Sequence, residues 1–235
     1  MTTNERRERP DARFRLIPLG LLRSRGFDLS AAFPVQAYNL AVPPNFHLPT
    51  YSCTASTLGI LVANSKALWP KFCTFIRAQP AFIQSTPNPF DAFVTLQVDE
   101  CIALARAQAH VPAAAQHDVR HYWEMTPGRM VAIQRMCQVA GVAYLDQACH
   151  LNVHTEYGPW LALRYAIVID LPGPDPASIP TLTNPIPASL QPHIHHAISQ
   201  LLAPGTSYHT RPVPTTTSTR RHPCLHHGTG SHAPW

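Results

Sequence analysis

Hydrophobic positions in the first half of the chain follow strand-like and helix-like spacing in turn. Residues 56–65, "STLGILVANS", are a short apolar run bounded by small polar residues, which is typical of a buried strand. Over 67–79 the apolar positions recur with the period of a helix that faces a core. A longer helix is expected over 89–110, because Pro89 suits a first turn and no breaker follows it. Strand followed by helix predicts layered α and β structure.

The second half continues the alternation up to residue 171. Its expected elements are a strand over 116–125, a helix over 128–141, and strands over 142–147 and 160–171. The last of these is rich in aromatic and β-branched residues, so we expect it near the centre of the sheet. Before the first strand, residues 12–26 predict a short helix that is broken at Pro18.

Two adjacent prolines restrict the backbone within the stretch "QAYNLAVPPNFHLP" at 36–49. Pro43 and Pro44 lack an N–H group and push the residue before each of them toward extended geometry. The pattern therefore predicts a stiff, extended corner that holds Phe46 and His47 in a fixed place.

Periodicity fades after residue 171. Residues 172–235 contain twelve of the 25 prolines and eight of the 14 histidines, with one weak helical pattern around "HIHHAISQLL" at 193–202. We therefore divide the chain into a disordered N-terminus at 1–11, one domain at 12–173, a weakly structured extension at 174–202 and a disordered Pro/His-rich tail at 203–235.

Charge, the length of apolar runs and cysteine spacing make some classes of protein function less favourable for this chain. The net charge of +5 comes from scattered Lys and Arg without a basic block, which disfavours nucleic-acid binding. No apolar run reaches the ~20 residues that span a bilayer, and no secretory segment begins the chain, so we expect a cytoplasmic protein without a membrane partner. The six cysteines form no C-x-x-C pair and are expected to be reduced thiols.

Familiar catalytic and metal motifs are absent from the sequence. It contains no G-x-S-x-G, no Walker loop and no G-x-G-x-x-G. The histidine clusters "HIHH" (193–196) and "CLHH" (224–227) lie in low-complexity sequence with no carboxylate close by, so no evolved metal site is expected there.

Arg164 is a charged side chain within the most apolar strand, "WLALRYAIVI". A buried guanidinium needs a partner, because an unpaired buried charge costs several kcal/mol. Two interpretations remain open: a structural carboxylate such as Asp99 or Asp146, or an anionic ligand held by two parallel hydrogen bonds.

Three segments in the same order resemble the cobalamin-processing CblC family. They are "AYNLAVPPNFHLP" (37–49), "QVAGVAYLDQ" (138–147) and "YGPWLALRYAIVIDLPG" (157–173), and the resemblance covers residues 14–173. It implies an α+β fold of the flavin-reductase or nitroreductase type, with a central antiparallel sheet flanked by helices. In this fold the corner at 36–49 would wall the cavity, with Phe46 packed and His47 in a structural hydrogen bond.

The chemistry that this resemblance implies is cobalamin processing. Such proteins bind cobalamin with its nucleotide base detached, remove cyanide with FAD or FMN reduced by NADPH, and transfer alkyl groups to glutathione. Detaching the base removes an electron donor from cobalt and makes it easier to reduce. The implied partners are a CblD-type adaptor, downstream cobalamin enzymes and a second copy of the chain.

The resemblance also implies site residues, carried over position by position. Cobalamin contacts fall at His121 or its neighbour Arg120 and at Val131, Ala132, Ile133, Gln134, Gln138, Leu145, Asp146, Gln147, Asn152 and Leu163; the glutathione contact falls at Arg164. No residue is assigned a catalytic role. Gln138 stands where the human-type sequence has histidine, and Pro159 replaces a glycine.

Two other functions remain open. The chain could be a cobalamin carrier without turnover, because the family's later arginines and aromatic residues have no counterpart beyond Gly173. It could also be a flavin-dependent reductase of the same fold with another substrate, although no cysteine cluster is present for an iron–sulfur version.

Overall fold

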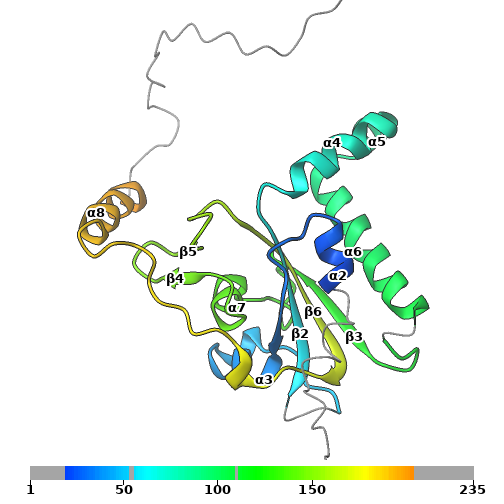
Figure 1. Cartoon of the computed structure of the whole chain (residues 1–235), viewed down its shortest axis with the longest axis horizontal. Helices are drawn as coiled ribbons and strands as arrows, with labels where there is room; N and C mark the ends of the chain where they lie inside the picture. The colour runs from blue at the N-terminus through cyan, green and yellow to red at the C-terminus, as the bar shows by residue number, and fades with distance from the viewer. Residues whose placement is uncertain (1–18, 53–55, 109–110, 204–235) are drawn as a thin grey trace, which may run out of the picture.

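The computed structural model describes residues 19–52, 56–108 and 111–203, which form a central antiparallel sheet flanked by helices (Figure 1). In spatial order the strands are β1 (Ala31–Pro34), β2 (Thr57–Asn64), β6 (Ala162–Pro172) and β3 (His117–His121). Each neighbouring pair is antiparallel. The α+β fold with a central antiparallel sheet is therefore confirmed.

The two central strands are the two that the sequence predicted with the clearest signals. All eight residues of β2 are buried, and the buried middle of β6 lies between β2 and β3. Strands covered on both faces read as continuous apolar runs, and such runs made both strands recognisable in the sequence. The predicted strand over 116–125 is shorter, because a turn begins at Tyr122.

A β-bulge in β6 decides which residues share a face. Val62 of β2 pairs with Tyr165 while the next residue, Ala63, pairs with Leu163, so Arg164 is an extra residue in its strand. A bulge of this kind reverses the alternation of faces beyond it. Leu163 consequently packs on one face of the sheet, whereas Leu171, eight residues later, packs on the other.

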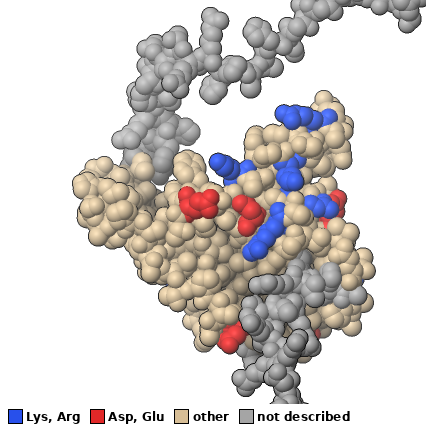
Figure 2. Space-filling view, in the orientation of Figure 1, with Lys and Arg blue, Asp and Glu red and all other residues tan. Residues whose placement is uncertain are grey.

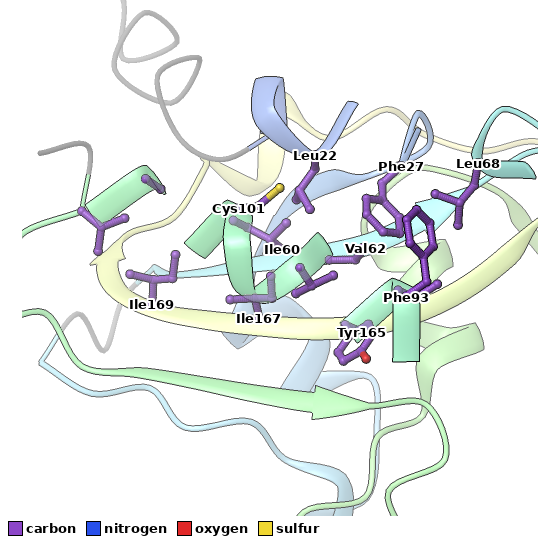
Figure 3. Close-up of a cluster of buried hydrophobic side chains, with 14 of the residues drawn as sticks. Leu22, Phe27, Ile60, Val62, Leu68, Phe93, Cys101, Tyr165, Ile167 and Ile169 are labelled. Carbon is purple, nitrogen blue, oxygen red and sulfur yellow. The ribbon is translucent and has the colours of Figure 1, made fainter. Parts of the chain in front are cut away.

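One face of the sheet is covered by helices from the first half of the chain. They are α2 (Leu19–Ser24), α4 (Leu68–Ala78) and α6 (Pro89–Ala107), while the short α5 (Ala81–Ser85) packs through Phe82 on Phe75 of α4. Figure 3 shows the core that they enclose: Leu22 and Phe27 meet Phe93 and Cys101 of α6 above Ile60, Val62, Tyr165 and Ile167 of the sheet. The predicted helices at 67–79 and 89–110 are both present within a few residues.

The opposite face is covered by two short helices, α3 (Val35–Leu40) and α7 (Ile133–Val139) (Figure 1). Phe33 packs against Gly59 of β2, where a Cβ atom would overlap the phenyl ring. α7 is half the predicted length, because residues 126–129 form a turn and Ala132 has a non-helical ψ of 71°. A small hairpin, β4 (Tyr144–Asp146) and β5 (Leu151–Val153), follows α7.

The prediction of an extended corner over 36–49 was wrong in part. The residues up to Leu40 continue α3, and Pro44–Phe46 form a 3-10 turn, η1, in which Pro44 occupies the first position. Proline is excluded from helix interiors but is well suited to a first turn. Pro43 is extended, Phe46 is half-buried, and exposed His47 contacts the Val42 carbonyl at 3.3 Å through Nε2.

The extension after Gly173 contains a 3-10 turn, η2 (Pro176–Ser178), and the helix α8 (Gln191–Leu202), where the weak helical pattern had been noted. Figure 1 shows α8 next to the β4–β5 hairpin. The predicted disordered segments at 1–11 and, apart from Ala203, at 203–235 lie outside the described residues. Of the six cysteines, Cys73, Cys101, Cys137 and Cys149 are free thiols, as predicted.

The surface carries few charged groups. On the face shown in Figure 2, basic side chains lie mainly over the region of α4, α5 and α6 and are interrupted by acidic ones. Among the described helices none is both long and apolar enough to cross a bilayer.

Candidate functional site

Most of the predicted cobalamin contacts gather around α7, on one face of the sheet. Val131, Ala132, Ile133 and Leu163 are half-buried and pack against the core beneath α3 and α7. Leu145 of β4 pairs with Asn152 of β5 beside the same helix. The candidate site therefore has an apolar floor formed by segments that are separated along the chain by up to 32 residues.

A buried tyrosine fixes the segment that leads into α7. The Ala132 N–H donates to the Tyr38 hydroxyl over 2.9 Å. Burial raises the pKa of Tyr38 to about 12, although the Ala132 N–H and Arg120 oppose the rise. The hydroxyl therefore stays neutral at physiological pH and holds residues 131–133 against the sheet.

Asn152 offers a polar group within this apolar setting. Its Nδ2 donates to the carbonyls of Gln134 (3.1 Å) and Ala143 (3.4 Å), which joins the hairpin to α7. The Asn152 side chain is buried, yet its Oδ1 has no hydrogen-bond partner among the described residues. An unsatisfied buried acceptor is costly, and a ligand N–H group would satisfy it only if the surrounding side chains move apart to expose Oδ1.

Asp146 is already paired. Its Oδ1 accepts from the N–H groups of Ala148 and Cys149, both over 3.0 Å, and its Oδ2 lies 3.1 Å from His195 Nε2 of α8. Burial alone would raise the pKa of Asp146, but these hydrogen bonds outweigh it and lower the pKa overall. The expectation that no carboxylate lies near "HIHH" was wrong, because folding brings Asp146 to His195 from 49 positions away.

The remaining polar residues of the predicted set are less enclosed. Gln134 and Gln147 are exposed, and Gln134 Nε2 donates to the His150 carbonyl over 2.5 Å. Gln138 is half-buried and its Oε1 accepts from Arg135 over 2.7 Å. Gln134 and Gln138 thus lie at the edge of the α7 segment and Gln147 in the turn after β4, all outside the apolar floor.

His121 lies on the other face of the sheet, away from this group. Its ring contacts the rings of Trp123 and Tyr165, with centroids 4.6 Å and 4.7 Å away, and burial lowers its pKa. Its Nδ1 is buried without a partner among the described residues. The neighbouring Arg120 lies on the opposite face from His121, where it donates to Asp118 over 2.7 Å and to the His47 carbonyl over 3.0 Å. Of the two residues, only Arg120 lies on the same face of the sheet as the predicted cobalamin contacts around α7.

Arg164 also lies on the α6 face and has a mixed set of partners. Its Nε donates to Asn64 Oδ1 over 3.0 Å, its guanidinium stacks 4.9 Å from the Phe90 ring, and Asp91 lies 3.8 Å away. Burial lowers the pKa of Arg164, and the Asp91 charge opposes that shift. The structural partner is thus Asp91, and the proposed partners Asp99 and Asp146 were wrong. At 3.8 Å the ion pair is long, and 13% of the Arg164 side chain remains exposed.

An open pocket of about 790 Å³ lies beside the predicted residues without including them. Ala31 of β1, Arg23 of α2, Gly141 after α7, and Ile179 and Pro180 of the extension are among its lining residues. Its volume is typical of small-molecule sites. Sequence reasoning missed this pocket, because the segments that line it are distant in sequence and carry no motif.

One known protein family matches most of the chain. The model of the methylmalonic aciduria and homocystinuria type C family matches residues 26–202. The chain belongs to this family. The match includes the extension at 174–202, which sequence analysis had placed outside the domain.

Relatives within the type C family are themselves named for cobalamin chemistry. The human cyanocobalamin reductase / alkylcobalamin dealkylase is 30% identical over 165 residues, which are 63% of this chain and 53% of that protein. The bovine protein of the same name is 30% identical over 155 residues, which cover 58% and 50%. The chain thus spans about half the length of these relatives.

A solved structure from the family shares the fold. The B12-trafficking protein CblC of C. elegans superposes with a TM-score of 0.65 at 19% identity, covering 81% of this chain and 80% of that one. At this identity the likeness establishes the fold only.

Proposed function

We propose that this protein binds cobalamin with its nucleotide base detached and removes the upper axial ligand. Membership of the type C family over residues 26–202 is the observation that carries the proposal. The apolar floor around α7 supports it, because a flat, partly apolar corrin ring needs such a surface. The unsatisfied Oδ1 of buried Asn152 supports it as well, since cobalamin carries amide N–H donors around its ring.

Within this proposal the protein supplies shape, and its co-substrates supply electrons. Val131, Ile133 and Leu163 exclude water from the ligand face, and Asn152 orients one amide of the ligand. FAD or FMN reduced by NADPH would drive decyanation, and glutathione would accept alkyl groups. Arg164 lies on the opposite face, next to Asp91, so in the proposal it holds the glutathione carboxylate rather than cobalamin.

Titration with cobalamin tests the binding step directly. Detachment of the base shifts the corrin absorption bands whether or not turnover follows. Leu163→Gln should weaken cobalamin binding about tenfold, because it places an amide in the apolar floor. The shift would then require a correspondingly higher cobalamin concentration. Leu171→Gln is the matched control, since Leu171 lies on the same strand but packs on the other face. No shift with the unchanged protein would remove the family function.

Incubation with cyanocobalamin, NADPH and FMN or FAD without oxygen tests turnover. We expect cob(II)alamin to form faster than in the protein-free control, and methylcobalamin to lose its methyl group to added glutathione. Tight base-off binding without either reaction would instead identify a carrier. Flavin reduction without any cobalamin binding would identify a reductase with another substrate.

A further inference from the structure

We propose that Asp146, Cys149 and His195 form a binding site for a divalent transition-metal ion, with Zn²⁺ as the ion that suits their donors. The three residues offer a carboxylate oxygen, a thiol sulfur and an imidazole nitrogen, all within 4.8 Å of one another. They come from β4, from the turn after it and from α8, so a bound ion would fasten α8 to the β4–β5 hairpin.

The spacing needs little adjustment to hold zinc. Tetrahedral zinc with bonds of 2.0–2.3 Å places its ligand atoms roughly 3.3–3.6 Å apart. His195 Nε2 and Asp146 Oδ2 are 3.1 Å apart, and Cys149 Sγ lies within 4.8 Å of the imidazole nitrogen and of a carboxylate oxygen. Small rotations of the Cys149 and His195 side chains would therefore bring all three atoms to bonding distance.

The surrounding backbone already orients the carboxylate. Asp146 is 3% exposed, and its Oδ1 is held by the N–H groups of Ala148 and Cys149, which leaves Oδ2 directed at His195. Hydrogen bonds of this kind to a ligating carboxylate are a common feature of metal sites. The same tight turn carries the Cys149 side chain, 5% exposed, to the carboxylate.

The chemistry of the three ligand atoms favours Zn²⁺ over Mg²⁺ and Ca²⁺. A mixed nitrogen, oxygen and sulfur set suits Zn²⁺ and related first-row ions, whereas Mg²⁺ and Ca²⁺ prefer oxygen ligands alone. Cys149 would bind as a thiolate and release its proton to solvent. The fourth tetrahedral position would be left for water. In the metal-free protein the Cys149 thiol hydrogen-bonds to the Asp146 carboxylate, and a bound ion would replace this weak contact with a bond to the thiolate.

Titration of the full-length protein with Co²⁺, in the absence of cobalamin, tests this site. Cobalt replaces zinc in tetrahedral sites, and only a thiolate ligand gives a sulfur-to-cobalt charge-transfer band. We expect such a band in the unchanged protein, its loss on adding Zn²⁺, and no effect of Mg²⁺. Cys149→Ser should abolish the band, and His195→Ala should weaken Co²⁺ binding about tenfold or more.

Two variants control for other Cys and His residues. Cys224→Ser removes the thiol of "CLHH", and His193→Ala removes a neighbouring histidine whose Nδ1 contacts the Ser189 carbonyl instead. Both should keep the band. A band that survives Cys149→Ser, or no band in the unchanged protein, would overturn the proposal. Protection of Cys149 from alkylation by Zn²⁺, located by peptide mass spectrometry, tests the same site without any substitution, and an unprotected Cys149 would also overturn it.

Discussion

At the scale of single residues, Arg164 shows how one insertion in a strand creates a functional candidate. The bulge turns its side chain toward α6, where Asn64, Phe90 and a distant Asp91 surround the guanidinium. Without the bulge, regular alternation would place Arg164 and Tyr165 on opposite faces. The strand pattern predicted a buried arginine, but the bulge determined what it meets.

We expect Arg164→Gln to raise the glutathione concentration needed for half-maximal dealkylation about 10- to 160-fold, equivalent to 1.5 to 3 kcal/mol for a charged hydrogen bond. Base-off cobalamin binding should remain, because the predicted cobalamin residues around α7 lie on the other face. Arg25→Gln is the control, since Arg25 is engaged by Glu100 and Gln97 of α6. Unchanged glutathione dependence in the Arg164 variant would contradict the assigned role, and thermal melts would reveal a purely structural one.

Gly59 is required by packing rather than by backbone conformation. An added Cβ would overlap the ring of Phe33, which is fully buried. We expect Gly59→Ala to destabilise the protein by about 1 to 3 kcal/mol, the usual cost of overpacking. Gly20→Ala, in α2 with open space around it, should be neutral or stabilising. Urea denaturation measures both, and equal stabilities for the two variants would contradict this account.

At the scale of elements, an ion network fixes strand β3 to the loop that leads into α7. Asp118 binds Arg120 over 2.7 Å and Arg129 over 2.9 Å, and Arg129 also donates to the Val119 carbonyl. Burial opposes ionisation of Asp118, but the two arginines outweigh it and lower its pKa. The network thus connects an edge strand to residues that precede the candidate site.

The lowered pKa makes the contribution of Asp118 dependent on pH. The contribution is complete above the unfolded-state pKa of about 3.9 and is lost as pH falls through the lower folded-state value. Asp118→Asn should therefore cost about 3 kcal/mol at neutral pH, because Arg120 loses its carboxylate partner, and much less near pH 2. Unfolding free energies at both pH values measure this. Asp99→Asn, at an exposed carboxylate of α6, is the control and should change the unfolding free energy by less than about 0.5 kcal/mol.

At the scale of the whole molecule, the extension after Gly173 belongs to the folded domain. Ile179 and Pro180 pack so closely on Gly141 that a Cβ atom there would lie 2.9 Å from Pro180 Cδ. His195 of α8 completes the hydrogen bonds of Asp146. The family match to residue 202 is consistent with this role.

Truncation after Gly173 should therefore destabilise the protein, with about 1.5 to 3 kcal/mol from the lost hydrogen bond to the Asp146 carboxylate alone. Truncation after Ala203 separates the contribution of 174–203 from that of the residues beyond. Thermal melts of both truncated proteins beside the full chain measure the difference. If the two truncated proteins melt alike, the extension does not stabilise the domain.

The sequence by itself determined the central strands, the two long helices and the family, because these rest on local periodicity and on motifs in a fixed order. It also placed most predicted cobalamin residues on segments that fold together around α7. Tertiary structure alone decided the rest. The bulge puts Leu163 and Arg164 on different faces of the sheet, and Arg120 and His121 likewise lie on opposite faces. Folding also brings Asp146, Cys149 and His195 together. Faces and partners depend on register and on contacts between distant segments, which no local pattern encodes.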